Sequence, residues 1–157
     1  EMPAVKLDPD AISYSAATSA CEKGRQWQQA QSLLTSLLCR KLQHDVPVYN
    51  TVISACEKGH QWELAMKILS GLLRRHFQPD ITTFNAAISA CEKGCQWQQA
   101  SSTLGALLQC CFRPDVITYN AAIGACENGC HWQQAPSLLV GLSSAATLPL
   151  RHDHTLH

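Results

Sequence analysis

The sequence predicts an all-α fold, a right-handed α-solenoid built from helix–turn–helix repeats, on three observations. The eleven-residue segment from Tyr14 to Gly24 returns in edited form at Tyr49, Phe84 and Tyr119, at a constant interval of 35 residues. Within each copy, apolar residues recur at spacings of three and four, which is typical of amphipathic helices. No segment alternates polar and apolar residues with the period of two that a half-buried strand requires. A fixed period of this length indicates a stack of similar supersecondary units.

The repeat divides most of the chain into four units. We expect repeats at 11–45, 46–80 and 81–115, a degenerate repeat that acts as a cap at 116–150, and a tail at 151–157. Residues 1–10 resemble the end of a preceding repeat, which indicates that the natural protein extends further upstream. Each unit of such a stack contacts mainly its neighbours, so four units should suffice for a modestly stable fold.

The first helix of a unit is clearest in the third repeat. There Ile81, Phe84, Ile88 and Cys91 fall on one helix face. Gly94 follows, and a glycine just past the last turn commonly supplies a left-handed cap. We expect the same role for the equivalent glycines, which are Gly24, Gly59 and Gly129.

The second helix of the third repeat should begin near Trp97 and carry Ala100, Leu104 and Leu107 on one side. It should end before Pro114, because proline lacks the helical donor and restricts the residue before it. The equivalent tryptophans are Trp27, Trp62, Trp97 and Trp132. We expect them to pack in the core or between repeats, and stacking on nucleic-acid bases is the alternative.

Nine cysteines would suggest disulfides in a small secreted domain, but their placement favours free thiols. Four of them share one position of the repeat and would lie too far apart in a solenoid to form bridges with one another. We expect these four to be buried thiols in a reducing compartment: Cys21, Cys56, Cys91 and Cys126. The others fall outside this series and can be exposed: Cys39, Cys95, Cys110, Cys111 and Cys130.

The composition limits the classes of function. Twelve Lys and Arg balance twelve Asp and Glu, which argues against strong non-specific nucleic-acid binding, although a neutral total can still contain a basic stripe. No apolar run approaches the roughly 20 residues of a membrane span. There is no glycine-rich phosphate loop, and the spacing of Cys126, Cys130 and His131 is not that of a zinc site. We therefore expect no enzyme activity, no cofactor, no metal and no small-molecule substrate.

The order of these features resembles the pentatricopeptide repeat family in its 35-residue P-type form. The resemblance rests on Val-Ile-Thr-Tyr-Asn-Ala-Ala-Ile at 116–123, on the glycine between the helices, on the alanine early in the second helix and on the closing Pro-Asp. Tetratricopeptide repeats differ, because they have a shorter period and place Trp in the first helix. The resemblance implies binding of single-stranded RNA, with one base per repeat read by two or three side chains. It also implies a location in mitochondria or plastids, with any targeting segment upstream of this chain.

The resemblance places the base-reading residues at the fifth and last positions of each repeat. These are Ser15, Asp45, Asn50, Asp80, Asn85, Asp115 and Asn120. In the family, Asn with Asp favours uracil, and Ser with Asp resembles the pairs that favour guanine. The expected RNA is therefore 5′-GUU-3′ followed by a pyrimidine. The alternative is that these side chains cap helices or bond the local backbone.

The resemblance also implies contacts to base faces and to phosphates. The second position of each repeat should carry an aliphatic residue that lies between bases. Ile12 and Ile117 fit this expectation, and Pro47 and Thr82 depart from it. Phosphate contacts are expected from Lys23, Lys58 and Lys93. A glutamate precedes each of these lysines, so an exposed, solvated Glu–Lys pair at a helix end is the alternative.

A structural role is the alternative to RNA recognition. The fourth repeat departs from the pattern, with Asn128 in place of Lys, Pro136 early in the second helix and Leu150 in place of Asp. A neutral solenoid with three complete base-reading pairs could have lost RNA and serve as a non-catalytic scaffold subunit of a ribosome, respiratory complex or photosystem. The expected partners are therefore single-stranded RNA or protein subunits of a large organellar complex.

Overall fold

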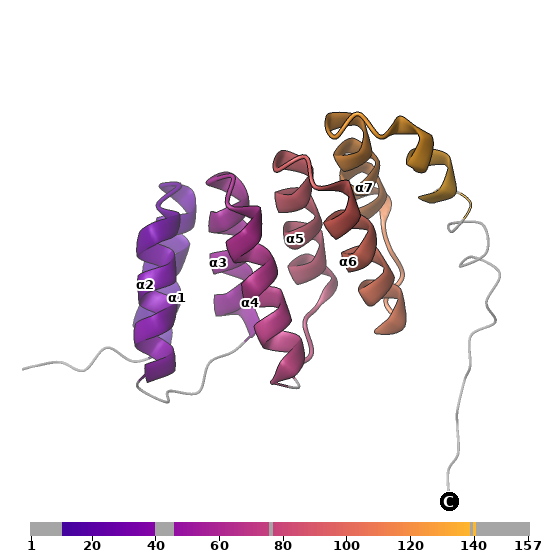
Figure 1. Ribbon diagram of the computed structural model, residues 1–157. Helices are drawn as coiled ribbons and strands as arrows, with labels where there is room; N and C mark the ends of the chain where they lie inside the picture. Colours follow the sequence, from indigo (N-terminus) through magenta and orange to yellow (C-terminus); the bar gives the residue numbers. More distant parts are fainter. Residues whose placement is uncertain (1–10, 40–45, 76, 139, 141–157) are drawn as a thin grey trace, which may run out of the picture.

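The computed structural model describes residues 11–39, 46–75, 77–138 and 140. Their regular structure is helical, and no strand occurs in these ranges. The helices are α1 (Ala11–Lys23), α2 (Trp27–Cys39), α3 (Val46–Lys58), α4 (Trp62–Arg74), α5 (Ile81–Lys93), α6 (Trp97–Gln109), α7 (Val116–Asn128) and the short 3-10 helix η1 (Trp132–Gln134). The solenoid fold expected from the sequence is confirmed (Figure 1).

The helices form a row of hairpins in two layers (Figure 1). The first helices of successive hairpins, α1, α3, α5 and α7, pack directly on one another. A second helix rests between two first helices, so that α4 contacts both α3 and α5. Because the hairpins repeat in one orientation, equivalent residues of successive repeats form continuous rows along the molecule.

The core runs along the row between the two layers. Its fully buried side chains include Ile53, Phe84 and Ile88 from first helices and Leu72 and Leu107 from second helices. The amphipathic pattern of the sequence therefore points inward as expected, and each hairpin completes the core of the next.

The predicted burial of the four cysteines that share one repeat position is confirmed. Cys21, Cys56, Cys91 and Cys126 are buried, the five outside this series are exposed, and all nine are free thiols. Burial raises the pKa of Cys56 and of Cys91 to about 11. These thiols are therefore neutral small side chains of the core at physiological pH.

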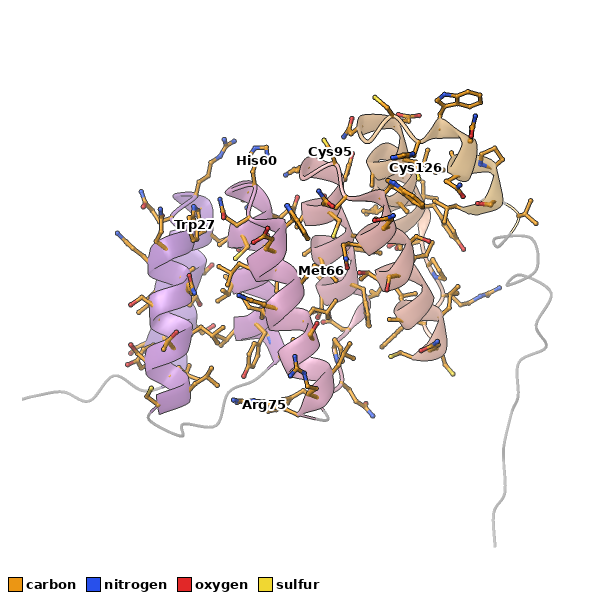
Figure 2. The ribbon with its side chains drawn as sticks, in the orientation of Figure 1. Trp27, His60, Met66, Arg75, Cys95 and Cys126 are labelled. Atoms are coloured by element: carbon orange, nitrogen blue, oxygen red, sulfur yellow. The ribbon has the colours of Figure 1, made fainter. Side chains whose placement is uncertain are left out.

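The glycines do not adopt the left-handed conformation that the sequence suggested. No glycine of the described residues has a positive φ, and Gly94 has a φ of −88°. The next residue, Cys95, is left-handed with a φ of 57°, and its amide bonds the carbonyl of Glu92 at 3.1 Å. Arg25, His60 and Cys130 do the same after the other three glycines. Figure 2 shows His60 and Cys95 at equivalent turns of neighbouring hairpins.

Close packing explains the glycines instead. A Cβ added at Gly94 would lie 2.3 Å from Cδ1 of Trp62, and one added at Gly59 would lie 2.4 Å from Cδ1 of Trp27. The tryptophan of one repeat therefore covers the glycine of the next, and only a residue without a side chain leaves room for the indole. The left-handed cap was a wrong prediction because the close contact is between repeats, which the local sequence does not reveal.

The tryptophans pack between repeats, as expected, at three of their four positions. Trp27, Trp62 and Trp97 are partly buried against the core clusters. Trp132 lies in η1 and is 68% exposed. In the fourth repeat the second helix starts as one 3-10 turn, and residues 135–138 are helical. None of the described helices is long and apolar enough to cross a membrane.

Candidate functional site

A closed cluster of polar side chains joins the second repeat to the third. Asn50 projects from α3, and its Nδ2 donates to both carboxylate oxygens of Asp80, at 3.1 and 3.2 Å. The hydroxyl of Thr83 donates to Oδ1 of Asn50. Asp80 is the N-cap of α5, and its carboxylate accepts a hydrogen bond from the Thr83 amide at 2.9 Å. The fifth and last residues of one repeat are therefore held together by the first turn of the next.

The same cluster recurs between the third and fourth repeats. Nδ2 of Asn85 lies 3.4 and 3.3 Å from the oxygens of Asp115, and the Thr118 hydroxyl donates to Oδ1 of Asn85 at 2.5 Å. Hydrogen bonds from the Thr118 backbone, from the Thr118 hydroxyl and from Asn85 hold the pKa of Asp115 below its usual value. The carboxylate is therefore ionised throughout the physiological pH range.

Each cluster keeps hydrogen-bonding capacity for a ligand. The amide of Asn50 has two donors and two acceptor lone pairs, and the internal bonds use one of each. Asp80 is exposed, and Asn50 and Asn85 are partly exposed. One donor and one acceptor lone pair therefore remain on each asparagine, beside an aspartate side chain, in a fixed arrangement.

The outer repeats do not show this cluster. Ser15 is partly exposed on α1, and its expected partner Asp45 lies outside the described residues. Asn120 is exposed on α7, where the equivalent of Asp80 would be Leu150, also outside them. Residues 1–10 and 151–157, which carry the expected repeat end and tail, are likewise not described.

The second positions form an exposed row next to these clusters. Ile12 is 78% and Ile117 is 65% exposed, although both are large apolar residues. Pro47 and Thr82 are also exposed at the equivalent positions. Two exposed isoleucines at the starts of α1 and α7 fit the role of contacting a flat ligand, which stays a prediction.

The lysines lie in a second row, at the ends of the first helices. Lys58 Nζ lies 2.8 Å from Oε1 of Glu22, and Lys93 Nζ lies 2.9 Å from Oε1 of Glu57. Each lysine thus pairs with the glutamate of the preceding repeat rather than with its neighbour in sequence. The interpretation as a solvated local pair is wrong, because stacking brings equivalent helix ends side by side.

Serines complete these ion pairs. Ser54 donates to Glu22 at 2.8 Å, and Ser89 donates to Glu57 at 3.0 Å. Burial alone would raise the pKa of Glu22, but hydrogen bonds from Lys58 and Ser54 outweigh it and lower the pKa. Lys23 has no ion-pair partner within the described part of the chain.

In the contact of α5 with α7, the serine and lysine donors of the earlier contacts are absent. Gly124 and Asn128 replace the serine and the lysine opposite Glu92. Burial is the largest cause that raises the pKa of Glu92, and the charges of Glu57 and Glu127 add to it. Asn128 donates to the backbone carbonyl of Glu92 at 3.2 Å, not to its carboxylate.

Sequence reasoning missed two kinds of residue in these rows. Thr83 and Thr118 close the asparagine clusters, and Ser54 and Ser89 close the ion pairs. The threonines stand in the same short motif that carried the resemblance, two residues before each asparagine position. Their contact is with the asparagine of the preceding repeat, so inspection of one repeat could not find it. In the described part of the chain, no three His, Cys, Asp or Glu side chains gather as a metal site would require.

Comparisons with known proteins agree with this architecture. Residues 44–93 match the PPR repeat family, and residues 74–128 match the pentatricopeptide repeat domain. No curated protein matches the chain significantly. Among solved structures, the pentatricopeptide repeat protein PPR10 from maize aligns with a TM-score of 0.76 and 22% identity, over 90% of this chain and 20% of that one. This chain therefore spans about a fifth of the length of PPR10.

Some of the similar structures contain RNA. PPR10 in complex with an 18-nt psaJ RNA element aligns with a TM-score of 0.71 and 22% identity, over 92% of this chain and 21% of that one. The PPR domain of Arabidopsis thaliana protein-only RNase P 1, in complex with tRNA, aligns with a TM-score of 0.74 and 9% identity, over 93% of this chain and 77% of that one. The two family matches together span residues 44–128, more than half of the sequence. The chain belongs to the pentatricopeptide repeat family.

Proposed function

We propose that this protein binds single-stranded RNA by sequence, one base per repeat, and that it catalyses no reaction. The observation that carries the proposal is the recurring cluster of Asn, Asp and Thr. It places an amide with free donor and acceptor capacity at the same point of two successive repeats. The RNA bound by PPR10 and by the Arabidopsis RNase P domain supports the choice of ligand.

The chemistry of the clusters favours uracil at the two central repeats. Uracil presents a carbonyl acceptor next to the N3–H donor, whereas cytosine presents an amino donor next to an N3 acceptor. The free Nδ2 hydrogen and Oδ1 lone pair of Asn50 match the uracil edge, and the same holds for Asn85. Asp80 and Asp115 hold the amides from the side and help to complete the reading of each base.

The proposed target is 5′-GUU-3′ followed by a pyrimidine. Ser15 with Asp45 reads guanine, the next two repeats read uracil, and Asn120 tolerates either pyrimidine. Ile12 and Ile117 contact the faces of the bases, since exposed aliphatic side chains bury apolar area against them. The proposed location is a mitochondrion or a plastid, where the protein would mark or shield a transcript.

The lysine row sets the strength of binding. Lys58 and Lys93 already pair with glutamates, so they add little net positive charge to the surface. Each stacked base contributes on the order of 1–3 kcal/mol, while association costs about 4 kcal/mol or more. Binding by these repeats alone should be micromolar or weaker.

Fluorescence anisotropy with labelled RNA tests the proposal. The wild-type chain should prefer an RNA with GUUU over a scrambled RNA of the same composition, and Asn50→Ala/Asn85→Ala should lose that preference. Gln98→Ala is the matched control, because Gln98 is exposed on α6 in the other layer. If neither RNA binds at two salt concentrations, a scaffold role on an organellar complex takes the place of RNA recognition.

A further inference from the structure

We propose that Thr83 and Thr118 are positioning residues that orient the base-reading amides, and so help to decide between uracil and cytosine. The inference rests on the proposed function and deepens it. Each threonine belongs to the repeat after the base-reading pair, at the third position of that repeat. The specificity of one repeat would therefore depend on a side chain of the next.

The hydrogen bonds around Asn50 form a closed ring. The backbone amide of Asp80 donates to Oγ1 of Thr83 at 3.2 Å, and this hydroxyl donates to Oδ1 of Asn50. Nδ2 of Asn50 then donates back to the Asp80 carboxylate at 3.1 Å. A hydroxyl has one hydrogen, and Oδ1 of Asp80 is also within its reach, 2.8 Å from Oγ1 of Thr83. The ring closes when that hydrogen points to the asparagine oxygen.

The ring around Asn85 has the same order. The amide of Asp115 donates to Oγ1 of Thr118 at 3.2 Å, and Oγ1 donates to Oδ1 of Asn85 at 2.5 Å. The bonds from Nδ2 of Asn85 to Asp115 are longer than those in the first ring, at 3.3 and 3.4 Å.

Orientation matters because an amide turned by half a rotation presents the opposite pattern. With Oδ1 bound by the threonine, the free hydrogen on Nδ2 and the free lone pair on Oδ1 occupy fixed places that match uracil. Without the hydroxyl, Oδ1 loses its donor, and the amide can turn or tilt away from the base. The threonines are fully buried, so water has limited access to replace the lost hydroxyl.

The first repeat offers a natural comparison. Val48 stands where Thr83 and Thr118 stand in the next two repeats, so no hydroxyl of this kind faces Ser15. A serine hydroxyl rotates and is both donor and acceptor, so it needs no partner to fix its orientation. The threonine occurs where the base-reading residue is asparagine, whose amide has an acceptor oxygen and a donor nitrogen and therefore needs a fixed orientation.

The first experiment measures discrimination between RNAs. Thr83→Val/Thr118→Val keeps the side-chain shape and removes the hydroxyls, while Thr83→Ser/Thr118→Ser keeps them. The preference for GUUU over GCCU should fall about two- to tenfold in the Val variant, the range of one ordinary hydrogen bond, and recover in the Ser variant. The ratio is taken on one protein, so loss of folded protein from a weaker capping box cancels.

A second measurement needs no RNA. Hydrogen exchange of the side-chain amides of Asn50 and Asn85, followed by NMR, should accelerate in the Val variant and stay slow in the Ser variant. Unchanged exchange in the Val variant overturns the inference, whether or not RNA binds. Wild-type discrimination that survives intact in the Val variant also overturns it and leaves the proposed function standing. Absence of any preference in the wild type rejects the proposed function alone.

Discussion

The contact of α3 with α5 and that of α5 with α7 use the same helix packing but different polar chemistry. In the first, the carboxylate of Glu57 accepts hydrogen bonds from Ser89 and Lys93 at 3.0 and 2.9 Å. In the second, Glu92 faces Gly124, and no described side chain donates to its carboxylate. The backbone arrangement survives this loss, so burial of apolar side chains, not the ion pair, holds successive repeats together.

The packing of tryptophan on glycine is also closer in the contact of α3 with α5 than in the contact of α5 with α7. A Cβ added at Gly94 would lie 2.3 Å from the nearest indole atom of Trp62, whereas a Cβ added at Gly129 would lie 3.3 Å from the nearest atom of Trp97. The indole of Trp97 therefore lies further from the glycine of the following repeat than the indole of Trp62 does. Four groups of substitutions test the packing, the ion pairs and the charges at these contacts, in order of decreasing expected effect.

Gly94→Ala should have the largest effect. Its Cβ must displace Cδ1 and Cγ of Trp62, which are part of a rigid ring, so we expect the free energy of unfolding to fall by about 1–3 kcal/mol. Gly129→Ala should cost less, because its nearest neighbours lie at 3.1 to 3.3 Å. Urea denaturation measures both.

Gly105→Ala is the matched control for these two variants. Nothing lies within 4 Å of a Cβ added at Gly105, inside α6, so this variant should gain about 0.5–1 kcal/mol from the helix preference of alanine. Equal losses from Gly94→Ala and Gly129→Ala would show that the two contacts are equally tight.

Much of this architecture was predictable from the sequence. The period of 35 residues, the inward apolar faces and the buried cysteines all follow from patterns within one repeat. The role of the glycines did not, because the residue that needs the space, such as Trp62 at Gly94, belongs to the preceding repeat. The left-handed conformation is adopted instead by the residue after the glycine, such as Cys95, whose side chain is exposed to solvent.

The candidate site likewise has residues that the sequence identified and residues that only the structure revealed. The motif placed Asn50 and Asp80, but the hydroxyl of Thr83 and the pairing of Lys58 with Glu22 required three-dimensional stacking. A contact between repeats joins residues 30 to 36 positions apart in the sequence. One sequence shows that such positions recur and does not show which of them touch.

Restoring the missing donors should stabilise the contact of α5 with α7. Gly124→Ser/Asn128→Lys gives Glu92 the partners that Glu57 has. The flexible Glu92 side chain must first move, because a Cβ at position 124 would lie 2.5 Å from its Oε1. We expect a net gain of about 1 kcal/mol from one hydrogen bond and one partly buried ion pair. Urea denaturation measures the gain. In a Glu92→Gln background the same pair should gain much less, because the carboxylate is its target. Equal gains in both backgrounds would contradict the pairing.

Two glutamine substitutions should show opposite pH dependence. The folded state raises the pKa of Glu92 above 4.5 and lowers that of Glu22 below 4.5. The ionised Glu92 therefore weakens the fold at neutral pH, and this cost disappears as the pH falls through the raised pKa. Glu22 contributes stability at neutral pH, which is lost as the pH falls through the lowered pKa.

Glu92→Gln should consequently be more stable than the wild type at neutral pH, with an advantage that vanishes in acid. Glu22→Gln should be less stable at neutral pH, with a deficit that shrinks in acid. Each difference is a few tenths of a kcal/mol to about 1 kcal/mol, as for other partly exposed charges. Denaturation at several pH values measures both, and differences of the same sign would show that the two glutamates share one environment.

The smallest effect concerns the lysines and RNA. Lys58 lies within 2.8 Å of Glu22, so removing both charges with Glu22→Gln/Lys58→Met should leave the salt dependence of RNA binding unchanged. Lys23 has no such partner among the described residues, and Lys23→Met should reduce the slope of log K against log salt by about 0.7, the value for one phosphate on a single strand. Anisotropy titrations across salt concentrations measure both slopes. A loss of slope in the double variant and none in Lys23→Met would mean that the paired lysine leaves its glutamate for the phosphate. The ion pairs between repeats would then be contacts that the protein exchanges for RNA.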